Sequence, residues 1–165
     1  MIARWHFHAA ERPRLRGGVA AVKVAAACQW RARIKFASVR LIAADIKQTV
    51  AFYEMVTGLK AEWLAPVFAE IVTPGATLAI GAPETVALFK EGCGEPGVNR
   101  TAYLEFQVDD IDAEYRRLKD KVSLVHEIKT MPWGNKTFMF RDPDGSAVSL
   151  YMPVTDGAKQ RFASR

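Results

Sequence analysis

The chain has 165 residues, half of them hydrophobic and a quarter charged, which is enough for one domain with a sizeable buried core. Its net charge of +5 comes from residues 1–35, which hold eight Lys or Arg residues against one acidic residue, Glu11. The other 130 residues carry 15 basic and 17 acidic side chains, so their charge gives no sign of nucleic-acid binding.

The first 35 residues are rich in arginine, nearly free of acidic residues and without serine. Organellar transit segments usually contain serine, so we expect a poorly ordered basic extension, with targeting or a basic interaction arm as alternatives. No stretch approaches the roughly 20 apolar residues that a membrane helix needs. Cys28 and Cys93 form neither a CxxC motif nor a disulfide framework, which favours a reducing, cytoplasmic location.

The rest of the chain repeats one plan of secondary structure. A short strand is followed by Asp45 and by a helix whose apolar face includes Ile46 and Tyr53. The stretch 103–118 has the same order 65 residues later, with Asp110 in the place of Asp45. A short carboxylate accepts hydrogen bonds from the free amides of a helix's first turn, so both Asp residues are predicted N-caps without a catalytic role.

A hairpin follows each of these helices. Residues 67–80 and 137–150 both have the pattern strand, Pro/Gly turn, strand. Setting the turn glycines on each other pairs Phe68 with Phe138. Each half is therefore predicted as a strand, a helix and three strands, joined by a Gly/Pro-rich connection, with a short helix or tail after Pro153.

Alternation along the strands divides their side chains between two faces. Apolar residues such as Leu41 and Leu104 point toward the helices, and polar residues gather on the opposite face. Concave faces with polar and aromatic side chains favour ligands, so we expect this face to line a cup that binds a small molecule. The residues predicted to bind it are Ser38, Arg40, Tyr103, Glu105, Gln107, Trp133, Ser149 and Tyr151.

Three of these residues have an alternative explanation that concerns structure alone. Arg40 and Glu105 occupy equivalent places in the two halves. Arg40 could clamp a carboxylate or phosphate while Glu105 acts as a base, or the two could form an ion pair that merely satisfies a polar cup. Trp133 either stacks on a ligand or packs into the core, while Gly134 and Asn135 are explained as turn residues.

The doubled plan, the segment "AADIKQTVAFYEMVTGL" and the closing "FRDPDGSAVSLY" resemble the vicinal oxygen chelate superfamily, which includes glyoxalase I, extradiol dioxygenases and bleomycin-resistance proteins. The resemblance implies an α+β fold in which two βαβββ repeats form a curled mixed sheet around a central cup, with the helices on the outer face. It also implies a homodimer. The chain then divides into the basic extension 1–35, this domain over 36–153, and a C-terminal tail over 154–165.

The resemblance also locates the metal ligands of the enzymatic relatives. Those His, Gln or Glu ligands come from the first strand of each half and from the last strand of one or both. The corresponding positions here are Ser38, Ala79, Tyr103 and Ser149. None is a histidine or a carboxylate, and neutral hydroxyls hold divalent metals poorly at pH 7, so we expect no metal and no cofactor. His126 is predicted on a strand away from these positions.

Three hypotheses on function follow. The first is a metal-free protein that binds and sequesters a small organic molecule in the cup, as bleomycin-resistance proteins do. The second is a glyoxalase-like lyase or isomerase, or a dioxygenase-type enzyme, acting on a small carbonyl or aromatic substrate; without metal it would use Glu105 or Tyr103 as candidate catalytic groups. The third is a structural or regulatory partner with a vestigial cup. We expect a small ligand and a second copy of the chain as partners, and neither nucleic acid nor a membrane.

Overall fold

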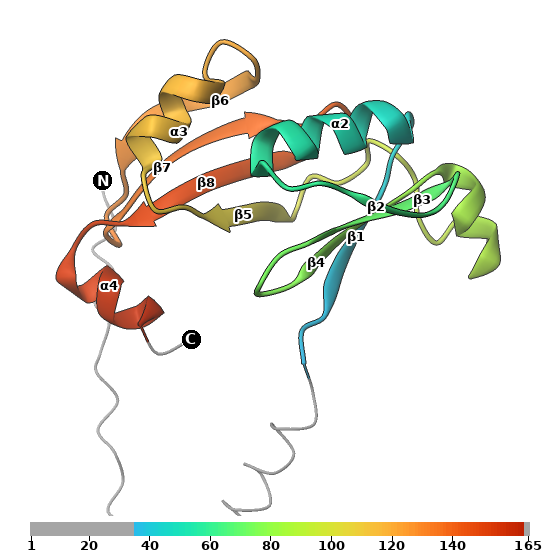
Figure 1. Ribbon diagram of the computed structural model, residues 1–165, viewed down its shortest axis with the longest axis horizontal. Coiled ribbons are helices and arrows are strands. Elements are labelled where there is room, and N and C mark those ends of the chain that lie inside the picture. Colours follow the sequence, from blue (N-terminus) through green and yellow to red (C-terminus); the bar gives the residue numbers. More distant parts are fainter. Residues whose placement is uncertain (1–34, 164–165) are drawn as a thin grey trace, which may run out of the picture. The chain divides into compact units, whose positions relative to one another are not determined.

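The computed structural model describes residues 35–163, so the prediction of a basic extension falls almost wholly outside the described residues. The described chain contains two halves, each built as a strand, a helix and three strands (Figure 1). The first half consists of β1 (Ser38–Ile42), α2 (Ile46–Thr57), β2 (Glu62–Ala65), β3 (Phe68–Val72) and β4 (Thr77–Gly81).

The second half follows a connection that contains a short 3-10 helix, η1 (Pro83–Leu88). It consists of β5 (Tyr103–Gln107), α3 (Ile111–Leu118), β6 (Ser123–Thr130), β7 (Asn135–Arg141) and β8 (Ala147–Pro153). The chain then forms a third helix, α4 (Asp156–Phe162), where a short helix or tail is expected. The predicted α+β fold with two βαβββ repeats is therefore confirmed.

The strands form two mixed four-stranded sheets, in the orders β1-β4-β3-β2 and β5-β8-β7-β6. In each sheet the first strand of the half runs parallel to the last one, a pairing that needs a crossover connection such as the intervening helix. Both α2 and α3 lie on the same, outer side of the sheets (Figure 1). The side of each sheet turned away from these helices is called the open face below.

The two long helices begin where the sequence predicts. Asp45 accepts a hydrogen bond from the amide of Gln48, and Asp110 accepts hydrogen bonds from the amides of Asp112 and Ala113. Both Asp residues have extended backbone angles, as N-cap residues do. They are therefore helix caps, as predicted from their place before an apolar periodic segment.

One hydrophobic core lies between the helices and the sheets and takes residues from both halves. The largest fully buried side chains include Tyr53 of α2, Ile71 and Ile80 of the first sheet, and Phe138 and Phe140 of the second. The predicted helix-facing residues of β1 and β5 pack in or against this core, which confirms the assignment of the strand faces.

The register of the hairpins differs from the predicted alignment by one residue. Ala69 pairs with Ile80, and Phe138 pairs with Leu150. Ala69, and not Phe68, is therefore the equivalent of Phe138, so the predicted pairing is wrong. The turn after β7 is one residue longer than the turn after β3, and aligning the turn glycines shifts the strand before the turn. Phe68 consequently lies on the open face.

Helix α4 returns to the open-face side of the second sheet. The ring of Phe162 lies 5.5 Å from the ring of Tyr151 on β8. The guanidinium of Arg161 donates to the carbonyl of Trp133 at 2.5 Å. A Cβ atom at Gly134, whose φ is +90°, would stand 2.0 Å from the hydroxyl of Thr155, the N-cap of α4. The absence of a side chain at this glycine allows the helix to dock on the loop before β7.

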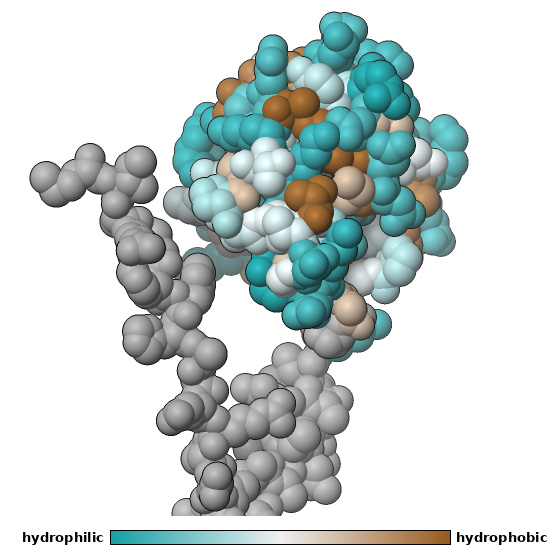
Figure 2. Space-filling view, turned by 90° about the vertical axis from the view of Figure 1, so that its left-hand side faces the viewer, coloured by the Kyte–Doolittle hydropathy of each residue, from teal (hydrophilic) through white to brown (hydrophobic). Residues whose placement is uncertain are grey.

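No helix within residues 35–163 is long and apolar enough to cross a membrane. Figure 2 views the molecule from the side that carries α3 and α4. Hydrophobic residues form small separate groups there among hydrophilic ones. The described surface on this side therefore has no single broad apolar patch.

Candidate functional site

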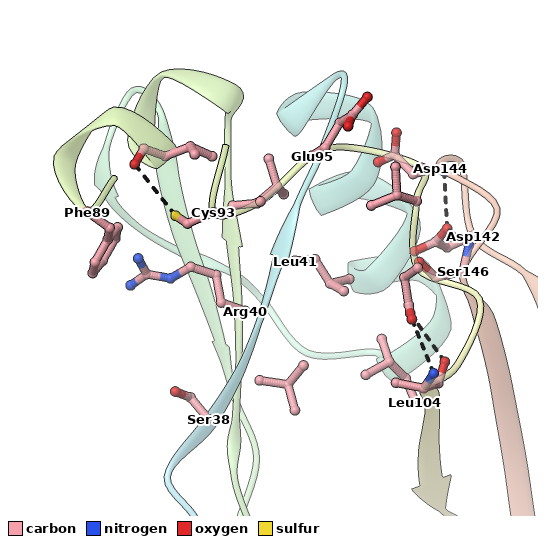
Figure 3. A pocket seen from close by; sticks show the side chains of 18 residues that line it. Ser38, Arg40, Leu41, Phe89, Cys93, Glu95, Leu104, Asp142, Asp144 and Ser146 are labelled. Atoms are coloured by element: carbon pink, nitrogen blue, oxygen red, sulfur yellow. Dashed lines mark hydrogen bonds between the residues drawn. The ribbon is translucent and has the colours of Figure 1, made fainter. Parts of the chain in front are cut away.

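The predicted ligand-binding residues line three depressions, two of which share Glu105 and Tyr151. Ser38 and Arg40 line a cleft of about 650 Å³ between β1, the connection after η1 and the turn after β7, called the first cleft (Figure 3). Gln107 lines a second cleft of about 660 Å³, beside the end of α2 and the turn after β3. The open face of the second sheet carries a hollow of about 100 Å³. The predicted residues therefore do not all line one depression of the described chain.

The first cleft has an acidic wall that also joins the two halves. Asp144 accepts hydrogen bonds from the amide of Ala44 at 3.1 Å and from the hydroxyl of Thr49. Buried Asp142 accepts one from the hydroxyl of Tyr53 at 2.8 Å. Burial, reinforced by the nearby carboxylate of Asp142, raises the pKa of Tyr53 well above its ordinary value, so this phenol remains a donor.

Arg40 lies on the opposite wall of the first cleft, next to Phe89 in Figure 3. Its guanidinium carbon is 4.7 Å from the centroid of the Phe68 ring and 5.0 Å from that of Phe89. The ion pairs of the described chain do not include Arg40 or Glu105. Of the two interpretations of this pair, the ion pair with Glu105 is therefore not formed.

The hollow collects five of the predicted residues: Tyr103, Glu105, Trp133, Ser149 and Tyr151. Tyr103 and Trp133 are more than half exposed and stand at its rim. Glu105 is exposed as well, and its β-strand neighbour Ser149 is buried. Since these residues come from β5, β8 and the loop before β7, the fold gathers side chains that lie far apart in the sequence.

The hydroxyl of Ser149 forms the floor of the hollow together with that of Thr137. The two hydroxyl oxygens lie 2.8 Å apart, and the Thr137 hydroxyl is also 2.8 Å from the carbonyl of Leu150. Both residues are at most 5% exposed. If Thr137 donates to Leu150, its oxygen is free to accept from Ser149, so the pair satisfies itself without a ligand.

Two buried polar atoms of the hollow residues have no partner among the described residues: Nε2 of His126 and Oδ1 of Asn135. The other ring nitrogen of His126, Nδ1, lies 2.8 Å from the carbonyl of Glu127, which can only accept a hydrogen bond. Nδ1 is therefore the donor of this contact, and in the corresponding neutral tautomer Nε2 is an acceptor. Buried polar groups are nearly always paired, so both atoms point to a missing donor.

The sequence interpretation missed His126 as part of the site. Its predicted strand is correct, but β6 and β7 pair irregularly on both sides of it. Leu124 pairs with Phe140, whereas His126 pairs with Met139, so two steps along β6 correspond to one step along β7. Such a bulge turns a side chain to the other face. His126 thus joins Met139, Ser149 and Glu105 in one row across the open face.

From the sequence, Asn135 is explained as a turn residue, and Trp133, in the same turn, as either a ligand contact or a core residue. Gly134 does occupy a left-handed turn conformation, and Asn135 begins β7 directly after it. The amide of Asn135 nevertheless contributes an unpaired acceptor to the hollow, which turn chemistry alone did not suggest. Trp133 is 54% exposed, so the interpretation as a core residue is wrong.

The four positions that the resemblance assigns to metal ligands do not fit a divalent metal. Ala79 has no donor atom and is buried, and the hydroxyl of Ser149 is paired with Thr137. Ser38 and Tyr103 are exposed neutral hydroxyls. No group of three His, Cys, Asp or Glu residues within 35–163 is arranged to hold a metal ion. The chemistry of this donor set therefore gives no basis for a metal-dependent step.

Comparisons with known proteins agree with the fold. YraH, an uncharacterised protein of Bacillus subtilis (strain 168), is 28% identical over 127 residues, which cover 72% of this chain and 98% of YraH. A glyoxalase/bleomycin resistance protein/dioxygenase from Nocardioides superposes with a TM-score of 0.64 at 19% identity, covering 81% of this chain and 95% of that one. Lactoylglutathione lyase from Agrobacterium tumefaciens has a TM-score of 0.57 at 21% identity, covering 71% and 92%.

A family model matches more than half of the chain. It matches residues 35–150, from before β1 to the middle of β8, and its description is Glyoxalase/Bleomycin resistance protein/Dioxygenase superfamily. The chain therefore belongs to the glyoxalase/bleomycin resistance protein/dioxygenase superfamily.

Proposed function

We propose that this protein binds a small organic molecule in the hollow of the second sheet, and that binding requires no metal. The observation that supports the proposal most directly is the pair of unpartnered buried acceptors, His126 Nε2 and Asn135 Oδ1. Leaving such an atom unpaired costs about 1–3 kcal/mol, which a bound molecule with suitable donors would offset.

The chemistry of the wall defines the kind of ligand. His126, Asn135 and Glu105 all offer acceptors, and three aromatic residues line the same hollow: Tyr103, Trp133 and Tyr151. Acceptors beside aromatic faces favour ammonium, amide or hydroxyl groups attached to a flat or apolar body. Ordered water could satisfy the same acceptors, since a hollow of this volume holds a few water molecules. The exposed rim favours an organic ligand that extends outward.

The test is a comparison of three proteins by thermal melting and by protein NMR, with benzylamine and benzamide as probes. Benzylamine or benzamide should stabilise the wild type and shift the resonances of β6 and β8. His126→Phe keeps the ring and removes the acceptor, so it should lose this response. Arg40→Gln, in the first cleft, is the matched control and should retain it. Equal responses of the wild type and His126→Phe would contradict the proposal.

The metal-free part of the proposal has its own measurement. Elemental analysis of the purified full-length chain should find no divalent metal in a stoichiometric amount, because the ligand positions offer only hydroxyls and an alanine. Chelation should leave the melting temperature unchanged. One zinc, nickel, manganese or iron ion per chain that survives dialysis would contradict it.

The same hollow supports a second candidate function, a metal-free lyase or isomerase. Glu105 and His126 belong to one row of the open face and both line the hollow. A carboxylate and a neutral imidazole are groups that can accept a proton from a bound substrate. Any turnover found with a small carbonyl compound should then be lost in Glu105→Gln, a variant that keeps the shape of the side chain. Sequestration alone predicts binding without turnover.

A further inference from the structure

We propose that the first cleft is a second binding site, which uses Arg40 to bind the carboxylate of a small organic monoanion. Arg40 is exposed and lines the cleft, yet it takes part in none of the ion pairs of the described chain. No hydrogen bond from its guanidinium is formed within residues 35–163 either. The positive charge is therefore available to a ligand.

Two aromatic rings orient this guanidinium. Phe68 stands at the start of β3 on the open face, and Phe89 directly follows η1. Both rings are within the distance at which a cation is attracted to an aromatic face. Across the β1–β4 pair Arg40 faces Ala79, and Phe68 on β3 faces Gly81 of β4, so neither of these β4 positions carries a large side chain.

This arrangement suits a carboxylate in particular. Ring contacts engage the flat faces of the guanidinium, whereas its N–H groups lie in the plane and point outward. A carboxylate can accept two parallel hydrogen bonds from that edge, which a single neutral acceptor cannot do. Because the rings already restrict the side chain, less conformational freedom is lost when the ligand binds.

The remaining lining of the first cleft suits an apolar body. Its apolar side chains come from β1, η1, the connection after η1 and β5, namely Val39, Leu41, Ile42, Val86, Val98 and Leu104. The volume of about 650 Å³ is within the usual range for small-molecule sites. The ligand thus combines one anionic group with a hydrophobic part.

The acidic wall limits the ligand to a single negative charge. Glu95, Asp142 and Asp144 line the side of the cleft away from Arg40 in Figure 3. Asp142 and Asp144 already accept hydrogen bonds from the first half, so their positions are fixed. A second carboxylate on the ligand would approach these groups and be repelled.

The experiment uses three probes of similar shape: benzoate, the neutral benzamide and the dianionic terephthalate. Binding to the full chain is followed by NMR, using the backbone amides of β1 and the Nε–H of Arg40. Benzoate should shift these resonances, and terephthalate and benzamide should bind at least about tenfold more weakly. Arg40→Lys keeps the positive charge but cannot donate two parallel hydrogen bonds from a planar guanidinium, so it should weaken benzoate binding several-fold. Arg40→Gln should abolish it.

The control variant is Glu105→Gln, which changes the hollow and should leave benzoate binding at Arg40 unaltered. Arg40 is exposed, so its variants should melt at nearly the wild-type temperature. Persistence in Arg40→Gln of the β1 shifts caused by benzoate would overturn the proposal, and so would benzamide binding equal to that of benzoate at the β1 and Arg40 resonances. Failure of benzoate at about 10 mM to shift any β1 resonance would overturn it as well. None of these results affects the hollow, which is tested with His126→Phe.

Discussion

The two halves share one plan but carry different chemistry on their open faces. Arg40 pairs with Ala79 across β1 and β4, and Glu105 pairs with Ser149 across β5 and β8. The equivalent positions on β1 and β5 thus hold opposite charges. Those on β4 and β8 hold a methyl group in one half and a hydroxyl in the other. The repeated part is the side that packs against the helices, where both sheets bury apolar residues in one core. The helix-facing side preserves the fold, and the open face is free to diverge.

The halves also differ in what their hairpin turns do. The turn after β3 is closed locally, because the hydroxyl of Thr73 and the carbonyl of Ala76 lie 2.5 Å apart. The turn after β7 instead contacts α2 through Asp142, and through Asp144 it contacts Ala44, two residues before that helix. The second half therefore holds the first in place, and this difference can be broken by mutation.

The largest effect is expected for Asp142→Ala. Buried Asp142 accepts hydrogen bonds from the Tyr53 hydroxyl and from the amides of Asp144 and Ser146. Removing it leaves three donors without a partner and should lower the free energy of unfolding by about 3 kcal/mol or more. Asp142→Asn retains the Oδ1 acceptor for both amides and should lose about half as much. Urea denaturation measures both values, and a loss below about 1 kcal/mol for Asp142→Ala would mean that the turn does not hold the halves together.

The next effect compares one glycine from each half. Gly58 and Gly134 both have positive φ, at +71° and +90°. A Cβ atom at Gly58 meets nothing within 4 Å, whereas at Gly134 it meets Thr155 of the α4 cap. Gly58→Ala should therefore cost about 1 kcal/mol from the backbone alone, and Gly134→Ala about 3 kcal/mol because it also displaces α4. Equal losses would show that α4 does not depend on this close approach.

A smaller effect is expected where α3 supports α2. Arg117 donates to the carbonyls of Met55 and Val56 near the end of α2, at 2.6 and 2.8 Å. Arg117→Gln removes these charge-assisted bonds and should lower the free energy of unfolding by about 1–2 kcal/mol. Arg116→Gln, on the same helix, is the control and should change it by less than about 0.5 kcal/mol. If the two variants melt alike, the contact between the helices contributes little.

The smallest effect concerns Glu54, within the first half. The hydrogen bond from the amide of Ala61, followed by that from Lys60, lowers the pKa of Glu54 below its ordinary value of 4.5. The stabilisation from its charge is therefore complete above pH 4.5 and disappears as the pH falls through the lowered pKa. Glu54→Gln should cost about 0.3 kcal/mol at pH 7, since exposed pairs are well screened, and nothing in strong acid. A loss that is independent of pH would exclude this electrostatic cause.

Much of the fold follows from the sequence because it depends on local chemistry. Asp45 and Asp110 are caps by virtue of a carboxylate placed before an apolar periodic segment. The alternation of β1 and β5 gives the correct buried face, since each strand is regular. These features need only the neighbouring residues, so one sequence is sufficient to predict them.

The candidate site is harder to predict from the sequence because it depends on irregular pairing between strands. The bulge in β6 moves His126 from the face of Leu124 to the hollow, and no local signal marks it. The extra residue in the second turn shifted the alignment of Phe68, the ring that contacts Arg40. Arg40 on β1 and Glu105 on β5 belong to different sheets, which do not pair with each other, so the two residues line different depressions. All three depend on tertiary structure.

The contacts of Asp142 and Asp144 also bear on how the chain folds. Asp144 bonds to Ala44 over 100 residues of sequence, and Asp142 bonds to Tyr53 over 89. During synthesis α2 can form and pack on its own sheet, but its start has no such partner until the last hairpin has left the ribosome. The native arrangement of the halves is thus a late, long-range event, and contacts of such sequence separation slow folding. An N-terminal fragment that ends before residue 142 should remain incompletely packed however long it is given.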